Sequence, residues 1–529
     1  MGMFLDNKTA YNNYKAMSRS RYFADKSAMI AELADCMENA QRYLCFTRPR
    51  RFGKSVMADM VASYFSQCCD SRDIFDGLDI SKWDGYEDHI NRYSVIYIDF
   101  SKTSGSYSDY NSYIERVVSG LKNDIREKYS AIDVGDDTAV WDDLERTGEQ
   151  YIFVLDEWDA VFHMRFMSED DKHDYLLFLR NLLKDNGYVR LAYMTGVLPI
   201  AKYSSGSELN MFAEYSMAVK KRFSEYFGFS EEETARLYET YLSYEDKPEI
   251  TRDDLRIWYD GYYNARGQKM YNPRSVICAL NDNQLSNYWT SSGPYDEIFY
   301  YIKNNIDDVR EDIVLMLSGE SVPAGIREYA ATSQRLETRD EIYSAMVVYG
   351  LLTYYNGRVS IPNKELMDKF NELVMDKDSM GYVHELAVKS RQMMEATLNG
   401  DKKTMSEILD TAHNTESPIL QYNSETELSA VVNLVYLSAR DDYRIVREEK
   451  AGKGFADFIF YPYDPSRDSI ILELKVDASP DEAIEQIKDK SYMLNLISNR
   501  RYTGKIYLIG ISYDRRTKTH SCAVEITEQ

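Results

Sequence analysis

Short runs of apolar residues alternate with segments of helical periodicity in the first part of the chain. The runs are rich in β-branched and aromatic residues and lie at 43–47, 94–100, 151–155 and 191–195. Amphipathic segments such as 55–65 and 175–183 separate them. Strands that alternate with helices predict a parallel sheet covered by helices on both faces. We therefore expect an α/β domain at about residues 1–228.

The stretch 229–400 has a different pattern, with helical periodicity, many charges and few strand signals. Near its end, two helical segments at 340–349 and 363–374 flank a short hairpin whose turn is Asn356-Gly357. This order is compatible with a small winged-helix module. The domain is therefore expected to be mainly helical.

An α/β pattern returns in the last domain, which we place at 401–529. Helices are expected at 424–437 and 481–497. Strands are expected at 444–449, 456–461, 469–476, 505–512 and 522–527. The chain is thus expected to be an α/β multidomain protein.

Composition and charge narrow the class of protein. The 529 residues carry 63 basic and 87 acidic side chains, a formal net charge of −24. Such acidity argues against a general nucleic-acid coat, because phosphate is repelled, but it does not exclude a local basic groove. No apolar run approaches the ~18 residues of a membrane span, and no secretory signal is recognised. Six scattered cysteines suggest neither a disulfide scaffold nor a zinc site, so we expect a soluble, cytoplasmic protein without membrane contact.

The first candidate site follows the first expected strand, where the sequence reads RPRRFGKS. Gly53, Lys54 and Ser55 fit the end of a phosphate-binding loop (Walker A), with Arg48 in the place of its first glycine. Gly53 would let backbone amides approach phosphate oxygens, Lys54 would neutralise them, and Ser55 would hold Mg²⁺. Arg48 and Arg51 belong to a basic segment without acids and are further candidates for cofactor contacts. A Gly-Lys-Ser turn that occurs by chance is the alternative.

A second half of this site follows the strand at 151–155. Asp156 at the end of a buried parallel strand would orient a nucleotide-bound Mg²⁺ (Walker B), and Glu157 could polarise the attacking water. Thr195 ends the next strand and could sense the γ-phosphate, although a Thr-Gly strand end is also an ordinary turn. An acidic first turn of a helix is the alternative for Asp156 and Glu157. We expect the strands of the two halves to be neighbours.

Four segments of this sequence resemble the AAA-ATPase-like family of bacterial proteins. They are RPRRFGKS, FVLDEWDA, MTGVLPIAK and WYDGYYNARGQKMYNPRSV. The resemblance implies an ATP-hydrolysing core at about 1–230 with a loop that starts with Arg, and a nuclease-like domain at the C-terminus. It names no certain arginine finger, for which Lys202 and Arg222 are candidates. The last of the four segments is expected to serve aromatic packing and an Asn-Pro turn.

The second candidate site combines two acids and a lysine. Glu473 and Lys475 are two residues apart in an apolar strand, so their side chains share one face while Leu472 and Leu474 face away. With Asp457 on the preceding strand, Glu473 would provide oxygen ligands for Mg²⁺. Lys475 would position the nucleophile or balance charge. An ordinary Glu–Lys pair on a half-exposed strand is the alternative.

This C-terminal region resembles the PD-(D/E)xK nuclease superfamily, whose restriction-endonuclease-like order of elements residues 424–512 follow. By position, the resemblance implies core residues Asp457, Glu473 and Lys475, a polar residue Gln486, an aromatic Tyr492 and an acid Glu425 on the first helix. Phe455 stands where relatives often have Arg, which puts one substrate contact in doubt. Catalytically inactive members of the superfamily are conceivable.

We therefore expect a hydrolase with ATP and Mg²⁺ as cofactors, in which the nucleotide state gates a metal-dependent nuclease acting on DNA or RNA. The alternative is an ATP-dependent signalling or scaffolding switch whose nuclease-like domain is a silent binding module. A DNA-binding regulator acting through residues 340–375 ranks last, because no basic recognition helix is evident. The oligomeric state stays open.

Overall fold

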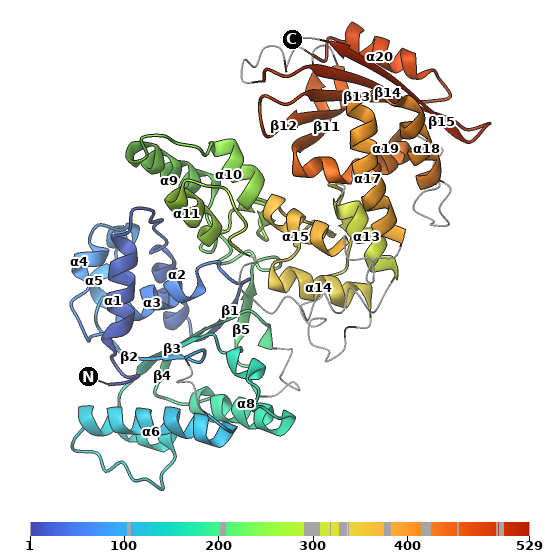
Figure 1. Cartoon of the computed structure of the whole chain (residues 1–529). Helices are drawn as coiled ribbons and strands as arrows, with labels where there is room; N and C mark the ends of the chain where they lie inside the picture. Colours follow the sequence, from blue (N-terminus) through green and yellow to red (C-terminus); the bar gives the residue numbers. More distant parts are fainter. Residues whose placement is uncertain are drawn as a thin grey trace. The chain divides into compact units, whose positions relative to one another are not determined.

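Two compact units make up the chain in the computed structural model. One comprises Met1–Ile298 and Pro323–Leu366, and the other Phe299–Val322 and Met367–Gln529. Each is described by itself, and Figure 1 labels their elements. The structure describes all residues except 1, 103–106, 201–207, 290–306, 318, 327–335, 337, 375–381, 414–424, 452–453, 494–495, 497–501 and 528–529. The expected division into three domains stays a prediction.

A five-stranded sheet forms the centre of the first unit. Its strands are β1 (Tyr43–Thr47), β2 (Ser94–Asp99), β3 (Tyr151–Asp156), β4 (Val189–Gly196) and β5 (Ala213–Ser216). They lie in the order β2-β3-β4-β1-β5, and every adjacent pair is parallel. The expected parallel α/β sheet is therefore confirmed.

The expectation that β1 and β3 are neighbours is wrong, because β4 pairs with both of them. Phe46 of β1 lies opposite Thr195, and Leu155 of β3 lies opposite Met194. The strand that comes later in sequence is therefore inserted between the two halves of the first candidate site. Its last residues lie between the ends of β1 and β3.

Helices cover both faces of this sheet (Figure 1). Ile152 and Val154 of β3 belong to one core, which α1, α2 and α3 help to build, while Phe153 and Leu155 belong to the core with α6 and α8. This alternation explains why the strand is a continuous apolar run. The helices are α1 (Lys8–Ser18), α2 (Met29–Glu38), α3 (Lys54–Phe65), α4 (Arg72–Phe75), α5 (Tyr86–His89), α6 (Tyr110–Lys128), α7 (Val140–Arg146) and α8 (Glu169–Leu183), with 3₁₀ turns at Asp79–Lys82 and Ala160–His163.

A small helical group and most of the expected helix–hairpin–helix belong to the first unit, and the chain passes into the second unit after Leu366. The group comprises α9 (Glu231–Tyr244), α10 (Arg252–Tyr259), β6 (Tyr262–Tyr263), β7 (Lys269–Met270) and α11 (Pro273–Asp282). The order of helix, hairpin and helix is confirmed as α14 (Arg339–Tyr349), β9 (Thr353–Tyr355), β10 (Arg358–Ser360) and α15 (Lys364–Val374). The helix α13 (Asp307–Leu317) belongs to the second unit, and the short strand β8 (Val322–Pro323) lies at the boundary in sequence between the two units.

The second unit contains a mixed sheet in the order β11-β12-β13-β14-β15. Only β13 and β14 are parallel among its adjacent pairs. Its strands are β11 (Tyr443–Ala451), β12 (Gly454–Pro462), β13 (Ser469–Val476), β14 (Ile506–Asp514) and β15 (Thr519–Thr527). Its helices are α17 (Tyr382–Leu398), α18 (Lys402–His413), α19 (Glu425–Val435) and α20 (Pro480–Asp489), with a 3₁₀ turn at Leu437–Asp441.

Two boundaries in this unit differ from the sequence-based expectation. β12 begins at Gly454, two residues before the strand expected at 456–461, because pairing with β11 continues through Ala456 to Gly454. The helix expected over 481–497 ends at Asp489, where the chain turns and Ser491 adopts a φ of 58°. A positive φ is uncommon for serine and is incompatible with a continuing helix.

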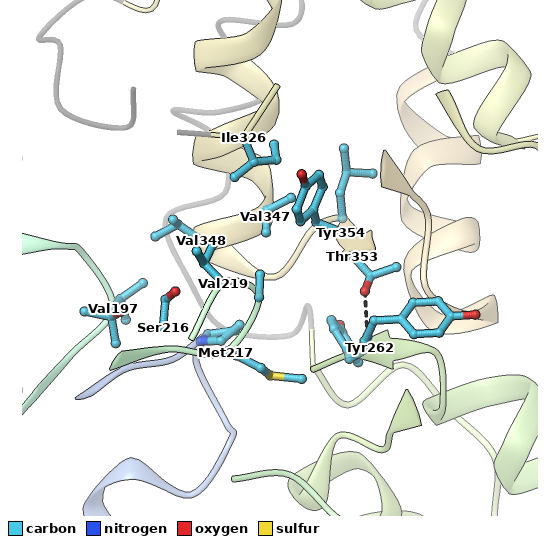
Figure 2. Close-up of a pocket in the computed structure, with 15 residues that line it drawn as sticks. Val197, Ser216, Met217, Val219, Tyr262, Ile326, Val347, Val348, Thr353 and Tyr354 are labelled. Carbon is cyan, nitrogen blue, oxygen red and sulfur yellow. Dashed lines mark hydrogen bonds between the residues drawn. The ribbon is translucent and has the colours of Figure 1, made fainter. Parts of the chain in front are cut away.

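The WYDGYY segment connects the helical group to the hairpin of the first unit. The Tyr262 hydroxyl donates to Gly350 O (3.1 Å), and the Tyr263 amide donates to the Thr353 hydroxyl (2.7 Å). Figure 2 shows the latter bond beside a small apolar pocket into which Val347 of α14 projects. Hydrogen bonds thus attach this segment to the hairpin. The Asn-Pro pair that was expected to form a turn is the N-cap and first residue of α11.

Gly261 in this segment cannot carry a side chain. Its φ is 104°, and a Cβ would overlap the backbone carbonyl of Pro362. We predict that Gly261→Ala lowers the free energy of unfolding by about 2–4 kcal/mol through backbone strain and overlap. Urea denaturation measures this change. Gly77→Ala is the matched control, because no atom lies within 4 Å of its Cβ, and an equal loss there would contradict the argument.

Candidate functional site

The loop of residues 48–53 connects β1 to α3 and ends in a left-handed glycine. Gly53 has a φ of 85° and precedes the first turn of α3, and no atom lies within 4 Å of where its Cβ would stand. Lys54 is buried, with Nζ 3.2 Å from Arg48 O and 3.7 Å from a Glu157 carboxylate oxygen. Ser55 is exposed in the first turn of α3. This geometry presents helix N-terminal amides and one ammonium group to an anion.

Arg48 does not line the cavity beside this loop, so the expected cofactor contact from its side chain is not supported. Its guanidinium is buried and donates to Thr47 O (2.8 Å), Tyr215 O and Phe223 O (3.2 Å). It also lies 4.3 Å from the Phe227 ring centroid. Burial lowers the pKa of Arg48 to about 9. Arg48 therefore anchors the start of the loop to β5 and to the segment after it.

Asp156 lies at the carboxyl end of β3 and is 1% exposed. The Thr195 hydroxyl at the end of β4 donates to it, and so does the Glu157 amide (3.1 Å). Burial raises the pKa of Asp156 to about 6, while hydrogen bonds from Thr195 and Ser55 oppose the increase. Ser55, Asp156 and Thr195 are thus brought together, although they come from three different elements. Their oxygens are the ligand type that Mg²⁺ prefers.

Two further acids follow Asp156. Glu157 has a φ of 50° and reaches toward Lys54. Asp159 was not singled out from the sequence. It is 3% exposed, and one of its oxygens accepts the amides of Val197 (3.0 Å) and Leu198 (2.8 Å). Burial, with Glu157 adding, raises the pKa of Asp159 to about 6. The sequence signal that could have identified Asp159 is its position three residues after Asp156.

Two cavities meet at this loop. The first, which we call the aromatic cavity, has a volume of about 430 Å³ and extends from Gly53, Lys54 and Ser55 to apolar side chains. The second, which we call the carboxylate cavity, has about 440 Å³ and is bordered by Arg51, Ser55, Glu157 and Asp159. The apolar wall of the aromatic cavity includes Met17, Tyr22, Phe23, Tyr226, Phe229 and Ile277. These residues come from distant parts of the sequence, so no local motif revealed them.

The candidates for an arginine finger receive no support from these cavities. Arg222 lines neither cavity and pairs with Glu32 and Asp35 near α2, at 3.3 Å each. Lys202 lies outside the described residues. The role of both residues stays a prediction.

The C-terminal site forms where two strands of the second unit separate. β12 and β13 pair from Phe460–Ile470 to Phe458–Leu472, and the next opposite residues are Asp457 and Glu473. Directly opposite residues of an antiparallel pair share one face. The Asp457 amide is 3.4 Å from Glu473 Oε2, and Asp457 Oδ2 accepts the Leu474 amide at 2.7 Å. The expected convergence of Asp457 and Glu473 is therefore observed.

Lys475 and Gln486 complete this group. Lys475 Nζ lies 3.5 Å from Glu473 Oε1 and 3.0 Å from Leu474 O. The Gln486 amide of α20 donates to Glu473, and its nitrogen lies 3.4 Å from the Tyr492 hydroxyl. Burial and the neighbouring Asp457 raise the pKa of Glu473 to about 7, while Lys475 opposes the increase. Glu425 is the first residue of α19, and the side chains of Glu425 and Phe455 lie outside the described part of the structure.

Mn²⁺ binding should report the raised pKa of Glu473. Metal binds the carboxylate form, so below about pH 7 protons compete, and the affinity should fall up to about tenfold per pH unit. Above that pH the affinity should level off. Isothermal titration of the whole protein at a series of pH values measures this. Glu473→Gln should remove the component of Mn²⁺ binding that changes near pH 7, whereas Glu485→Gln, at an exposed acid of α20, should preserve it. An unchanged titration in Glu473→Gln would exclude this carboxylate as the ligand.

Comparisons with known proteins match two separate segments of the chain. Residues 9–205 match the family model of a predicted AAA-ATPase, and residues 424–521 match the PD-(D/E)XK nuclease superfamily. An uncharacterized protein of the vnfD 5′ region of Azotobacter chroococcum mcd 1 is 27% identical over 282 residues, 51% of either chain. The chain therefore spans about half the length of this curated relative.

Solved structures with similarity to the chain include a protein of Pyrococcus abyssi and one of Aeropyrum pernix. The Walker-type ATPase paby2304 of Pyrococcus abyssi is 14% identical, with 64% of this chain and 94% of that chain covered and a TM-score of 0.33. The ORC2 protein of Aeropyrum pernix is 11% identical, with coverage of 70% of this chain and 95% of that chain and a TM-score of 0.32.

Among the described residues, no helix has both the length and the apolar character that a membrane span requires. By its two family matches, the chain combines an ATPase-like domain with a domain of the PD-(D/E)XK nuclease superfamily.

Proposed function

We propose that the first unit binds and hydrolyses ATP and that the second cleaves phosphodiester bonds of nucleic acid with a divalent metal, under the control of the nucleotide state. The observation that carries this proposal is the convergence of Asp457, Glu473 and Lys475 where β12 and β13 separate. The residues of the nucleotide site converge independently around Lys54 and Asp156.

The residues around loop 48–53 fit a nucleoside triphosphate with Mg²⁺. The open space beside Gly53 admits a phosphate close to the backbone, and Lys54 would balance its charge. Ser55 and Asp156 would hold the cation. Burial raises the pKa of Asp156, because the protein donors around this carboxylate do not fully compensate its negative charge. The aromatic cavity offers apolar rings against which a base can stack. Glu157 is placed to accept a proton from water.

The C-terminal residues fit a divalent cation in the same sense. Asp457 and Glu473 are two carboxylates that lie opposite each other on the adjacent strands β12 and β13. Burial disfavours the charged form of Glu473. A bound Mg²⁺ would activate water and stabilise the charge that develops on the phosphate. Lys475 would orient a phosphate oxygen or the nucleophile, and Gln486 would fix the orientation of the Glu473 carboxylate.

One observation favours the alternative, a nucleotide-dependent switch with a silent nuclease-like module. Lys475 and Gln486 already provide two partners for Glu473, at Oε1. A carboxylate that is satisfied by protein donors has less need of a metal. In this alternative the second unit binds a partner without cleaving it. Cleavage by the purified protein distinguishes the two functions.

Lys54→Ala should abolish the ATPase. Without the ammonium group the β- and γ-phosphates lose their main counter-charge, so we expect hydrolysis to fall by about 100-fold or more. Phosphate release and binding of a fluorescent ATP analogue measure the loss. Lys82→Ala provides a control, since Lys82 is 79% exposed and pairs with Asp79 away from both cavities. Normal turnover in Lys54→Ala would refute the proposed nucleotide site.

Glu473→Gln and Lys475→Ala should each reduce cleavage of DNA or RNA about 100-fold or more in the presence of Mg²⁺ or Mn²⁺, because each removes one charge from the proposed metal site. Lys488→Ala on the exposed side of α20 should cleave normally. In Lys54→Ala the cleavage rate should no longer respond to ATP. Gel assays with single- and double-stranded substrates measure these rates.

The outcomes separate the parts of the proposal. A wild type that hydrolyses ATP but cleaves neither DNA nor RNA with any divalent metal would refute the nuclease and support the switch. Cleavage at equal rates with and without ATP would refute the gating while leaving both sites intact.

A further inference from the structure

Two consecutive cysteines follow the helix α3. Cys68 and Cys69 lie shortly after its last residue, Phe65, and their Sγ atoms are 3.3 Å apart. Both residues are partly exposed free thiols. Cys36, Cys45 and Cys522 are buried, whereas Cys278 is partly exposed. The structure thus contains one pair of accessible thiols in contact, and Cys278 as a natural comparison.

The pair is held in place by the surrounding backbone. The Gln67 amide donates to Tyr93 O (3.0 Å), and the Cys68 amide donates to the Ser66 hydroxyl (3.2 Å). The Cys68 sulfur also lies 3.9 Å from Asn7 O. The contact between the thiols is therefore part of an ordered segment. A sulfur–sulfur bond of about 2.05 Å needs only a short further approach.

A small cavity borders one residue of the pair, Cys68. It has a volume of about 400 Å³ and is bordered by Cys68 together with charged residues of both signs. Lys8 and Lys128 provide positive charge, and Lys128 pairs with Asp6 at 2.7 Å. A small charged molecule can therefore reach Cys68 through this cavity.

We propose that Cys68 and Cys69 form a redox modification site that closes to a vicinal disulfide by exchange with a low-molecular-weight disulfide such as glutathione disulfide. The site is separate from both candidate sites described above and does not depend on the proposed function.

The exchange is balanced in two steps. One protein thiolate attacks the small disulfide, which breaks its S–S bond, forms a mixed disulfide and releases one small thiol. The second protein thiolate then attacks the protein sulfur of the mixed disulfide, forms the Cys68–Cys69 bond and releases the second small thiol. Two protein thiols are oxidised, the small disulfide is reduced by two electrons, and the two protons leave on the released thiols.

Geometry makes this bond a reversible one. Adjacent Cα atoms are about 3.8 Å apart across a trans peptide, below the 4.4–6.8 Å that is usual for disulfides, so the closed form is strained and readily reduced. Burial, with Cys69 adding, raises the pKa of Cys68 to about 11. Because the thiolate is the nucleophile, ring closure should accelerate as the pH rises from about 7 to 9.

The test uses the full-length protein with glutathione disulfide as the probe. After incubation the protein is denatured in N-ethylmaleimide, and its intact mass and peptides are measured. Reduced protein should carry six alkyl groups, one for each cysteine. Oxidised protein should carry four, and the peptide with Cys68 and Cys69 should lose two hydrogens and carry no glutathione. Cys278→Ser should still lose two alkylation sites.

Cys68→Ser and Cys69→Ser should each retain one stable glutathione adduct on the remaining cysteine, because ring closure is impossible. The proposal is overturned if wild-type Cys68 and Cys69 remain fully alkylated at all glutathione ratios. It is equally overturned if they accumulate mixed disulfides without closing, or if the loss of two alkylation sites persists in Cys68→Ser.

Discussion

Burial of acidic side chains is the physical constraint common to both candidate sites. Asp156 and Glu473 are 1% and 3% exposed, and burial raises the pKa of each. A buried carboxylate is unfavourable unless hydrogen bonds or a cation compensate its charge. Asp156 is the last residue of β3, and Glu473 lies in β13 just beyond the last residue that pairs with β12. Side chains donate to both acids, from Thr195 in the first unit and Gln486 in the second. The sheets therefore hold in place groups that the hydrophobic core would otherwise exclude.

The order of strands in the first unit determines which side chains can act together. Since β4 is inserted between β1 and β3, the Thr195 hydroxyl lies between loop 48–53 and Asp156. Arg48 anchors that loop by donating hydrogen bonds to the backbone carbonyl of Tyr215 in β5 and to that of Phe223 after β5. The position of Lys54 and Ser55 thus depends on the edge strand β5, on the buried guanidinium of Arg48 and on the Thr195 hydroxyl. Arg48 acts on this position from outside, because it lines neither cavity.

Local patterns in the sequence predicted most of the helices and strands, whereas they carried no information about long-range packing. The parallel sheet, the helix–hairpin–helix and the shared face of Glu473 and Lys475 follow from periodicity. The separation of β1 from β3 does not, since no local signal says which strand inserts between two others. The inward direction of Arg48 depends on carbonyl groups more than 150 residues away. The apolar wall around Tyr22 and Phe229 likewise depends on tertiary contacts. The end of α20 at Asp489 is followed by the positive φ of Ser491, which no local pattern indicated.

The register of β12 and β13 has a consequence for how this domain can diverge. Asp457 and Glu473 are opposite each other because Phe458 pairs with Leu472. Inserting or deleting a single residue within either strand would move one acid to the other face of the sheet. The connection between the strands, at 463–468, can change in length as long as that register is kept. A descendant of this sequence can therefore keep the carboxylate pair only if Asp457 and Glu473 stay on the same face of the sheet. The residues of the turn matter less.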